Sequence, residues 1–456
     1  MTTRRFPEGF EWGMGTAAYQ IEGGVHEGGR GPSIWDTFSH TPGAITRGDT
    51  GDVACDHYHR LDRDLDLLAE LAMPAYRFSV AWPRVMPDGR TLNQDGLDFY
   101  ARLVDGLLDR GIEPMLTLYH WDLPQALEDV GGWRSRETVD RFADYATLVG
   151  KELGDRVGTL TTLNEPWCTA YLGHATGEHA PGLRDPALAY PVAHHLNLAH
   201  GRAAAALRSV VPASARLSVT LNLQHVVAAS DEQADRDAAE HARVLSNDVF
   251  LGPMLRGRYD DAVFEETARL TDWSFVRDGD EAECCVPLDF LGVNYYSPGR
   301  VSATPNDDPW PGSRTAFRVR MPELPQTVMA WPVQPSALTE LLTDVHREYR
   351  VPLVVTENGI AGHDVVDAEH RVRDGHRIDY LRDHLGAVLD AVDAGADVRG
   401  YVAWTFLDNF EWAWGYEMRF GLVHVDFDTL VRTPKDSAHW LSDVIARNRL
   451  LLPERP

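Results

Sequence analysis

The chain has 456 residues, of which 44% are hydrophobic and 25% charged, a balance typical of a folded globular protein and not of a disordered one. With 43 Lys and Arg against 69 Asp and Glu, the formal net charge is −26. Such an acidic chain is disfavoured as a partner of nucleic acids or anionic membrane surfaces, whereas a neutral ligand is unaffected by the charge.

Eight short segments, rich in β-branched and aromatic residues, have the composition of strands buried on both faces. Several of them end in Asn, Glu or Gly, which is typical of a strand that runs into a turn. In chain order, the predicted strands are Phe10–Gly15, Ala75–Trp82, Pro114–Trp121, Thr159–Glu165, Ala215–Asn222, Asp289–Tyr296, Leu353–Glu357 and Gly400–Phe406.

Segments with helical spacing of apolar residues lie between these strands, where crossovers between parallel strands are expected. They are Asp62–Leu71, Phe99–Asp109, Val139–Lys151, His194–Arg208, Ser336–Tyr349 and Ile378–Ala394. Eight alternating units favour a closed (β/α)8 barrel of the TIM type over a doubly wound sheet. We expect one α/β domain over residues 1–456 with long βα loops, including an aperiodic loop at 300–335 near the mouth.

Two of the predicted strands end in a glutamate. One run ends in Asn164-Glu165-Pro166, and the other ends in Glu357-Asn358-Gly359. Catalytic groups of α/β barrels lie at the C-terminal ends of the strands, so both carboxylates should face one mouth. A pair of carboxylates is what cleavage of a glycosidic bond requires.

Other strand ends carry amides, a histidine and several tryptophans, which suit a carbohydrate pocket. Indole faces cover the apolar side of a sugar ring, and amide, imidazole and carboxylate groups bind its hydroxyls. The complete set at the predicted mouth is Gln20, Arg77, His120, Trp121, Asn164, Glu165, Asn294, Tyr296, Glu357, Trp404, Glu411 and Trp412.

The chain resembles glycoside hydrolase family 1, the β-glucosidase family. Residues 10–23 are similar to the N-terminal signature of that family, and TLNEP at 162–166 and TENG at 356–359 are similar to its acid/base and nucleophile motifs. The resemblance continues through RFSVAWPR at 77–84, LYHWDLP at 118–124, FLGVNYY at 290–296 and WTFLDNFEWAWGY at 404–416.

The resemblance implies that Glu165 is the general acid and base and that Glu357 is the nucleophile. It further implies that Arg77, Asn294 and Tyr296 surround the nucleophile and that the sugar is held by Gln20, His120, Trp121, Asn164, Trp404, Glu411 and Trp412. On the aglycone side it implies Trp331, although the glycine that usually precedes this tryptophan is Ala330 here. Cys168, Leu172 and His179 are further candidates for the entrance.

A family of this kind is retaining, so the two carboxyl groups should lie about 5–5.5 Å apart. The charge of Glu357 should then raise the pKa of Glu165, and Arg77 and Tyr296 should keep Glu357 ionised. An anionic Glu411 would accept hydrogen bonds from the sugar and repel a 6-phosphate. No metal and no organic cofactor is expected.

The favoured function is an exo-acting β-glucosidase that acts on β-glucosides or oligosaccharides. Two alternatives stay open: a broader β-galactosidase or β-fucosidase specificity on the same site, and a non-catalytic carbohydrate-binding barrel. Metal-dependent isomerases or aldolases form a third class, but His194, His195 and His200 lie on a predicted helix, where packing or surface roles are favoured over ligation.

The four cysteines, at positions 55, 168, 284 and 285, form neither a disulfide framework nor a C-x-x-C zinc pattern. The N-terminal residues lack the apolar segment of a secretory signal, and no apolar run approaches a membrane span. We therefore expect a cytoplasmic protein without membrane or nucleic-acid partners, and a homo-oligomer stays open.

Overall fold

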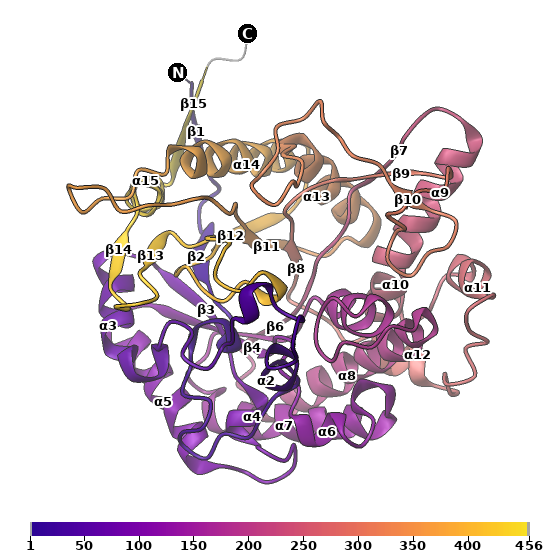
Figure 1. Cartoon of the computed structure of the whole chain (residues 1–456), viewed down its shortest axis with the longest axis horizontal. Helices are drawn as coiled ribbons and strands as arrows, with labels where there is room; N and C mark the ends of the chain where they lie inside the picture. Colours follow the sequence, from indigo (N-terminus) through magenta and orange to yellow (C-terminus); the bar gives the residue numbers. More distant parts are fainter. Residues whose placement is uncertain (1, 454–456) are drawn as a thin grey trace.

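The structure is a computed structural model and describes residues 2–453. Within them, eight parallel strands close into a barrel in the order β11-β12-β2-β3-β4-β5-β6-β8, with helices around it (Figure 1). The predicted (β/α)8 barrel is thus confirmed. Its strands are β2 (Glu11–Gly15), β3 (Ala75–Ser79), β4 (Glu113–Tyr119), β5 (Thr159–Asn164), β6 (Arg216–Leu221), β8 (Phe290–Asn294), β11 (Leu353–Asn358) and β12 (Val398–Trp404).

All six predicted helices are present, and most begin a few residues before the predicted start. They are α3 (His57–Glu70), α5 (Gln94–Asp109), α7 (Arg136–Leu153), α8 (Ala189–Val210), α13 (Pro335–Tyr349) and α14 (Gly375–Asp393). Helix α5 shows why they form: its buried residues, among them Leu97, Tyr100, Leu103, Val104 and Leu107, recur at helical spacing on one face.

The centre of the barrel contains hydroxyl groups as well as apolar side chains. Thr161 on β5 hydrogen-bonds Ser218 on β6 over 2.7 Å, and Thr220 donates to Thr356 on β11 over 3.3 Å. Gly292 on β8 is required there, because a Cβ at this position would lie 2.4 Å from Oγ1 of Thr220. The small residue lets β8 pass between two threonines, and polar strand residues thus pair inside the barrel.

The predicted loop at 300–335 contains secondary structure that was not predicted. Strands β9 (Gly299–Ser302) and β10 (Phe317–Arg318) form a three-stranded sheet with β7 (Val226–Ala228). Trp310 packs with Val301 and Ala316 in a small core that is separate from the main one. These strands are too short to show an alternating pattern, and their pairing is non-local, so the sequence interpretation as one aperiodic loop was wrong here.

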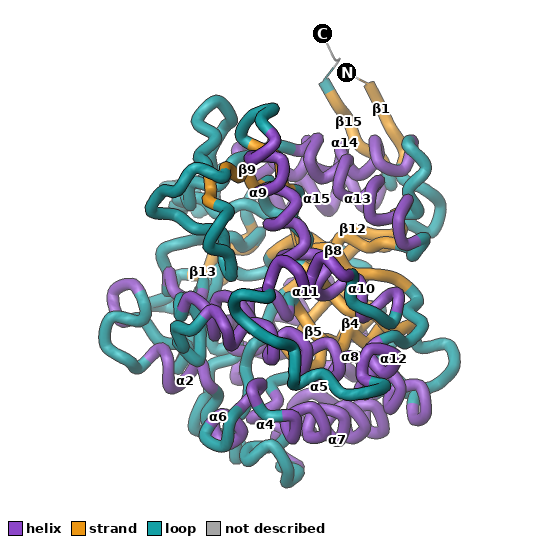
Figure 2. The backbone as a smooth tube through the Cα atoms, turned by 90° about the vertical axis from the view of Figure 1, so that its right-hand side faces the viewer, coloured by secondary structure: helices purple, strands orange, loops and turns teal. Residues whose placement is uncertain are grey.

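Further short elements decorate the barrel. The terminal strands β1 (Thr2–Arg5) and β15 (Arg449–Leu452) pair antiparallel and project from the body (Figures 1 and 2). Strands β13 (Val423–Val425) and β14 (Arg432–Pro434) form a second small ribbon. The other α-helices are α1 (Ala18–Ile21), α2 (Ile34–Ser39), α4 (Trp82–Val85), α6 (Gln125–Glu128), α9 (Gln233–Arg243), α10 (Val249–Arg256), α11 (Asp261–Thr267), α12 (Asp280–Cys284) and α15 (Asp436–Arg447).

Within residues 2–453, no helix combines the length and apolarity that crossing a bilayer would need. The three histidines of α8 are buried in packing roles, which is one of the two roles that the sequence left open. His194 contacts Tyr259 and Asp280, His195 contacts the carbonyl of Trp133, and His200 contacts Thr162.

Candidate active site

The side chains at the C-terminal ends of the barrel strands converge on one buried cluster. Glu357 lies on β11 and Glu165 directly follows β5, and the two residues are 3% and 6% exposed. Arg77 comes from β3 and Asn294 from β8, and both are also buried. Four strands that are distant in sequence thus deliver two carboxyls, one guanidinium and one amide to the same place.

Arg77 links this cluster through both ends of its guanidinium. Nη1 donates to Oε1 of Glu357 over 2.6 Å, and Nη2 donates to Oδ1 of Asn164 over 2.7 Å. The hydroxyl of Tyr296 donates to the other oxygen of Glu357 over 2.8 Å. Glu357 is therefore held from both oxygens by donors that favour its ionised form.

Asn294 holds the second carboxyl. Its Nδ2 donates to Oε1 of Glu165 over 2.7 Å and also lies 3.1 Å from Oδ1 of Asn164. The hydroxyl of Thr356 donates to Oδ1 of Asn294 over 2.8 Å, which fixes the amide with its nitrogen toward Glu165. The donors on Glu165 are a neutral amide and, at Oε2, the thiol of Cys168.

The two carboxyl groups differ in what opposes the effect of burial. Burial and then the charge of Glu357 raise the pKa of Glu165 to about 8. At Glu357, burial also raises the pKa, but the charge and hydrogen bond of Arg77 and the hydroxyl of Tyr296 oppose it. A proton shared by the pair therefore resides on Glu165, and Glu357 carries the negative charge.

A polar wall with unused hydrogen-bonding groups adjoins the carboxyls. Asn164 donates from Nδ2 to Nε2 of His120 over 3.0 Å, so the hydrogen of this imidazole lies on Nδ1. Burial and the charge of Arg77 lower the pKa of His120 well below its usual value and keep it neutral. Among residues 2–453, neither Nδ1 of His120 nor Oε1 of Gln20 has a partner, so a donor and an acceptor are left for a ligand.

Glu411 closes this wall beside Gln20, whose Nε2 donates to the carbonyl of Phe410 over 2.9 Å and lies 3.5 Å from Oε2 of Glu411. Burial, followed by the charges of Glu357 and Glu165, raises the pKa of Glu411 to about 8. Glu411 thus ionises less readily than a solvent-exposed glutamate, and the anion predicted from the sequence stays a prediction.

Aromatic rings form the apolar side of the pocket. The ring centroids of Trp121 and Trp412 lie 4.4 Å apart, and His120 stacks on Trp404 with centroids 5.8 Å apart. Trp121, Trp412 and Glu165 all have positive φ angles, of 76°, 46° and 48°. Non-glycine residues rarely adopt this conformation, and such strain is concentrated at functional sites.

The four residues expected at the entrance lie at different places around the pocket. Trp331 is half-buried beside Tyr296, with ring centroids 5.6 Å apart. His179 packs on Trp121 at 5.2 Å, and the carbonyl of half-buried Leu172 accepts from its backbone N–H. Cys168 is buried against Glu165.

A hollow of about 600 Å³ adjoins His179. Its lining includes Phe38, Thr46, Glu178, Arg184 and Trp414, and Trp414 is 43% exposed.

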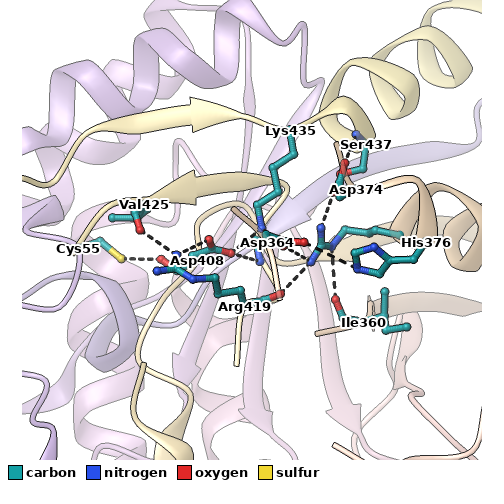
Figure 3. Close-up of polar contacts among 12 residues, drawn as sticks. Cys55, Ile360, Asp364, Asp374, His376, Asp408, Arg419, Val425, Lys435 and Ser437 are labelled. Carbon is teal, nitrogen blue, oxygen red and sulfur yellow. Dashed lines mark hydrogen bonds and ion pairs between the residues drawn. The ribbon is translucent and has the colours of Figure 1, made fainter. Parts of the chain in front are cut away.

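Two sets of residues in and behind the site were not singled out from the sequence. Asn222, one residue beyond β6, donates from Nδ2 to the sulfur of Cys168 over 3.6 Å, and its place at a strand end was the available signal. The second set is a buried charge network (Figure 3), in which Lys435 contacts Asp364 and Asp408, Arg377 contacts Asp364, and Arg419 contacts Asp408.

Known proteins of similar sequence and structure cover almost the whole chain. The model of glycosyl hydrolase family 1 matches residues 2–450. A bifunctional β-D-glucosidase/β-D-fucosidase from Bifidobacterium breve is 52% identical over 97% of this chain and 99% of the relative, and β-glucosidase A from Thermotoga maritima is 44% identical over 99% and 100%. The structure of a family 1 β-glucosidase from T. maritima in complex with isofagomine lactam superposes with a TM-score of 0.94 at 43% identity, covering 98% of this chain and 100% of that one.

Proposed function

The chain belongs to glycosyl hydrolase family 1, and we propose that Glu165 is the general acid and base and Glu357 the nucleophile of a retaining β-glucosidase. The observation that carries this assignment is the unequal environment of the two carboxyls. Glu357 accepts hydrogen bonds from a guanidinium cation and a phenol. Glu165 accepts them from a neutral amide and a thiol. An ionised nucleophile beside a protonated acid is the arrangement that a double displacement requires.

In the first step, an oxygen of Glu357 forms a bond to the anomeric carbon while the bond from that carbon to the glycosidic oxygen breaks. Glu165 gives its proton to the departing oxygen. The charge of Glu357 is then lost in the ester, so the pKa of Glu165 falls. In the second step, Glu165 takes a proton from water, the water oxygen bonds to the anomeric carbon, and Glu357 leaves as the carboxylate.

We assign the binding of the terminal sugar to the wall beside the carboxyls. Nδ1 of His120 and Oε1 of Gln20 are a free donor and a free acceptor, and Asn164 and Glu411 adjoin them. Trp404 offers an aromatic floor. Trp121 and Trp412 are assigned to the side wall.

To the aglycone side we assign Trp331, Cys168, Leu172 and His179.

A β-fucosidase activity on the same site is a second candidate function. The relative from B. breve is described as both a β-D-glucosidase and a β-D-fucosidase, and it is 52% identical to this chain. A β-glucoside 6-phosphate should be a poor substrate, because the burial of Glu411 disfavours a phosphate dianion beside it and the ionised carboxylate of Glu411 would repel that dianion.

The test is kcat/KM of the wild-type protein on the p-nitrophenyl β-D-glucoside, β-D-galactoside, β-D-fucoside and β-D-glucoside 6-phosphate. The proposal expects the glucoside or the fucoside to be preferred. Preference for the phosphate would show that Glu411 does not face the 6-position, and absence of turnover on the whole panel would favour the non-catalytic binding protein.

We further propose a cytoplasmic location, which is supported by four cysteines that are all free in the described part of the chain. Cell fractionation tests it. Homo-oligomer formation is a separate proposal, and light scattering on the purified protein measures it directly.

A further inference from the structure

Cys168 contacts the acid/base residue, and the double displacement does not use it. Its sulfur lies 3.3 Å from Oε2 of Glu165, and the thiol is the donor. The backbone holds the two residues together as well, because the N–H of Cys168 donates to the carbonyl of Glu165 over 3.0 Å. Cys168 also begins the π-helix Cys168–Thr176, so its place beside the carboxyl is set by regular structure.

The hydrogen of this thiol has a defined direction. Asn222 donates from Nδ2 to the sulfur over 3.6 Å, so the sulfur accepts on that side and directs its own S–H toward Glu165. Burial and the charge of Glu165 raise the pKa of Cys168 well above its usual value. The side chain therefore stays a thiol, and hence a donor, near neutral pH.

We propose that Cys168, oriented by Asn222, is a positioning residue for proton transfer, which donates its S–H to Oε2 of Glu165 and stabilises the carboxylate formed when Glu165 protonates the leaving group. The inference rests on the proposed role of Glu165. It does not require Cys168 to touch the substrate or to give up its proton.

The charge balance of the first step explains why a donor is needed at this place. Before the step, the negative charge is on Glu357, where Arg77 and Tyr296 stabilise it. After the step, Glu357 is a neutral ester, and the negative charge has moved to Glu165. Asn294 and Cys168 donate hydrogen bonds directly to the two oxygens of Glu165, and these bonds then stabilise the new carboxylate.

Other groups also act on the ionisation of Glu165. Glu357 from β11 raises its pKa and Arg77 from β3 lowers it. Tyr296 and Glu411 also interact electrostatically with Glu165, and the charge of Glu178 raises the pKa of Cys168. These groups stay in place when Cys168 is replaced, so a change on replacement reports the thiol.

The two chemical steps should respond differently to loss of the thiol donor. Without it, Glu165 is a weaker acid and a stronger base. Formation of the glycosyl-enzyme should therefore slow for poor leaving groups, which need the proton, whereas hydrolysis of the glycosyl-enzyme should not slow. A residue that only fills space would affect both steps alike.

The experiment compares Cys168→Val, which removes the donor, with Cys168→Ser, which keeps one. Cys284→Ala, at a buried cysteine on α12, is the matched control. Each variant is assayed on phenyl β-D-glucoside and on 2,4-dinitrophenyl β-D-glucoside across pH. Thermal unfolding and titration of active sites with 2-deoxy-2-fluoro-β-D-glucosyl fluoride correct for misfolded protein.

For Cys168→Val, we expect the alkaline pKa of kcat/KM to rise by about half to one pH unit, because a donor that favours the ionised acid is gone. We expect kcat/KM on the phenyl glucoside to fall about threefold to tenfold, and kcat on the dinitrophenyl glucoside to stay within about twofold. Cys168→Ser should resemble the wild type, and Asn222→Ala should shift the alkaline pKa in the same direction by less.

An unchanged alkaline pKa in Cys168→Val, or equal losses on both substrates, would overturn the proposal, as would a Cys168→Ser variant no better than Cys168→Val. Glu165→Ala separates this result from a failure of the proposed function. If Glu165 is the acid, that variant loses far more activity on the phenyl than on the dinitrophenyl glucoside. If Glu165→Ala loses equal activity on the two substrates, Glu165 is not the acid, and the assignment fails before the role of Cys168 is tested.

Discussion

Arg77 donates to Oε1 of Glu357 over 2.6 Å, and both side chains are shielded from solvent. The same guanidinium donates to Asn164, which in turn donates to His120. One arginine thereby holds the proposed nucleophile and orients the wall that we assign to the sugar hydroxyls. An Arg–carboxylate pair at low dielectric also has a large effect on which carboxyl is ionised.

Replacing Arg77 with Met should raise the pKa of Glu357, since its main opposing charge is lost while burial remains. The acidic limb of kcat/KM then moves to higher pH, and kcat falls by about 100-fold or more, as for the loss of one preorganised donor at a reacting centre. The pH profile of Arg77→Met on p-nitrophenyl β-D-glucoside checks this. A profile that falls in height with no shift of its acidic limb would contradict the electrostatic role.

The alkaline limb of the wild-type profile should come from Glu165. This residue must be protonated for the first step, and its pKa is raised to about 8, so kcat/KM should be constant between the acidic limb set by Glu357 and that value, and fall as the pH rises through it. In Glu357→Gln, the nearby charge is gone, and the pKa of Glu165 should fall. Titration of Glu165 by NMR in that variant measures the effect, and a rise in its pKa would contradict the coupling.

The barrel was predictable because its strands carry a local signal. The run Leu353–Asn358 is buried at every position, so β-branched and apolar residues follow one another there without alternation. The small sheet of β7, β9 and β10 has no such signal, since its strands are short and its partners lie far apart in the chain. Tertiary contacts alone form it.

The chemical identity of the candidate site was predictable for a related reason, because polar residues at the ends of buried strands must share one face of the barrel. Its hydrogen-bond directions were not. That Asn294 turns its nitrogen to Glu165 depends on Thr356, and that Cys168 directs its hydrogen to Glu165 depends on Asn222. The partners of Lys435 are 71 and 27 residues away, so no local pattern reveals them.

Lys435 connects two loops of the site. Its fully buried ammonium group contacts Asp364, in the segment after β11, and Asp408, in the segment that leads from β12 to Glu411 (Figure 3). Lys435→Met would leave these carboxylates with one cation fewer, and removal of one partner of a buried pair costs about 3–5 kcal/mol. We expect a clearly lower Tm and a higher KM for glucosides.

The exposed pair between Arg399 and Asp397 provides a control for Lys435. Arg399→Met should cost less than about 1 kcal/mol, because exposed ion pairs contribute little. Thermal unfolding of both variants under the same conditions compares the two costs. Equal shifts in Tm would show that burial of the Lys435 network is irrelevant to its effect.

The hollow beside His179 should contribute to the binding of long substrates only. Trp414 is the exposed aromatic residue in its lining, and an indole face is a common platform for a sugar ring. Trp414→Ala should lower kcat/KM for cellotetraose about fivefold, in the range of one lost stacking contact, and leave p-nitrophenyl β-D-glucoside unchanged. Equal losses on both substrates would indicate a general disturbance of the neighbouring pocket and not a subsite.

The roles of the two glutamates can be separated by chemical rescue. Glu357→Gly removes the proposed nucleophile and should abolish turnover of 2,4-dinitrophenyl β-D-glucoside, since no covalent intermediate forms. Azide can enter the space left by the carboxylate and attack the anomeric carbon from that side, which inverts the configuration once and gives the α-glucosyl azide. NMR of the product distinguishes the two anomers. In Glu165→Ala, azide should instead attack the glycosyl-enzyme and give the β-azide, because Glu357 has already inverted the centre. A β-azide from Glu357→Gly would mean that the roles of the two residues are reversed.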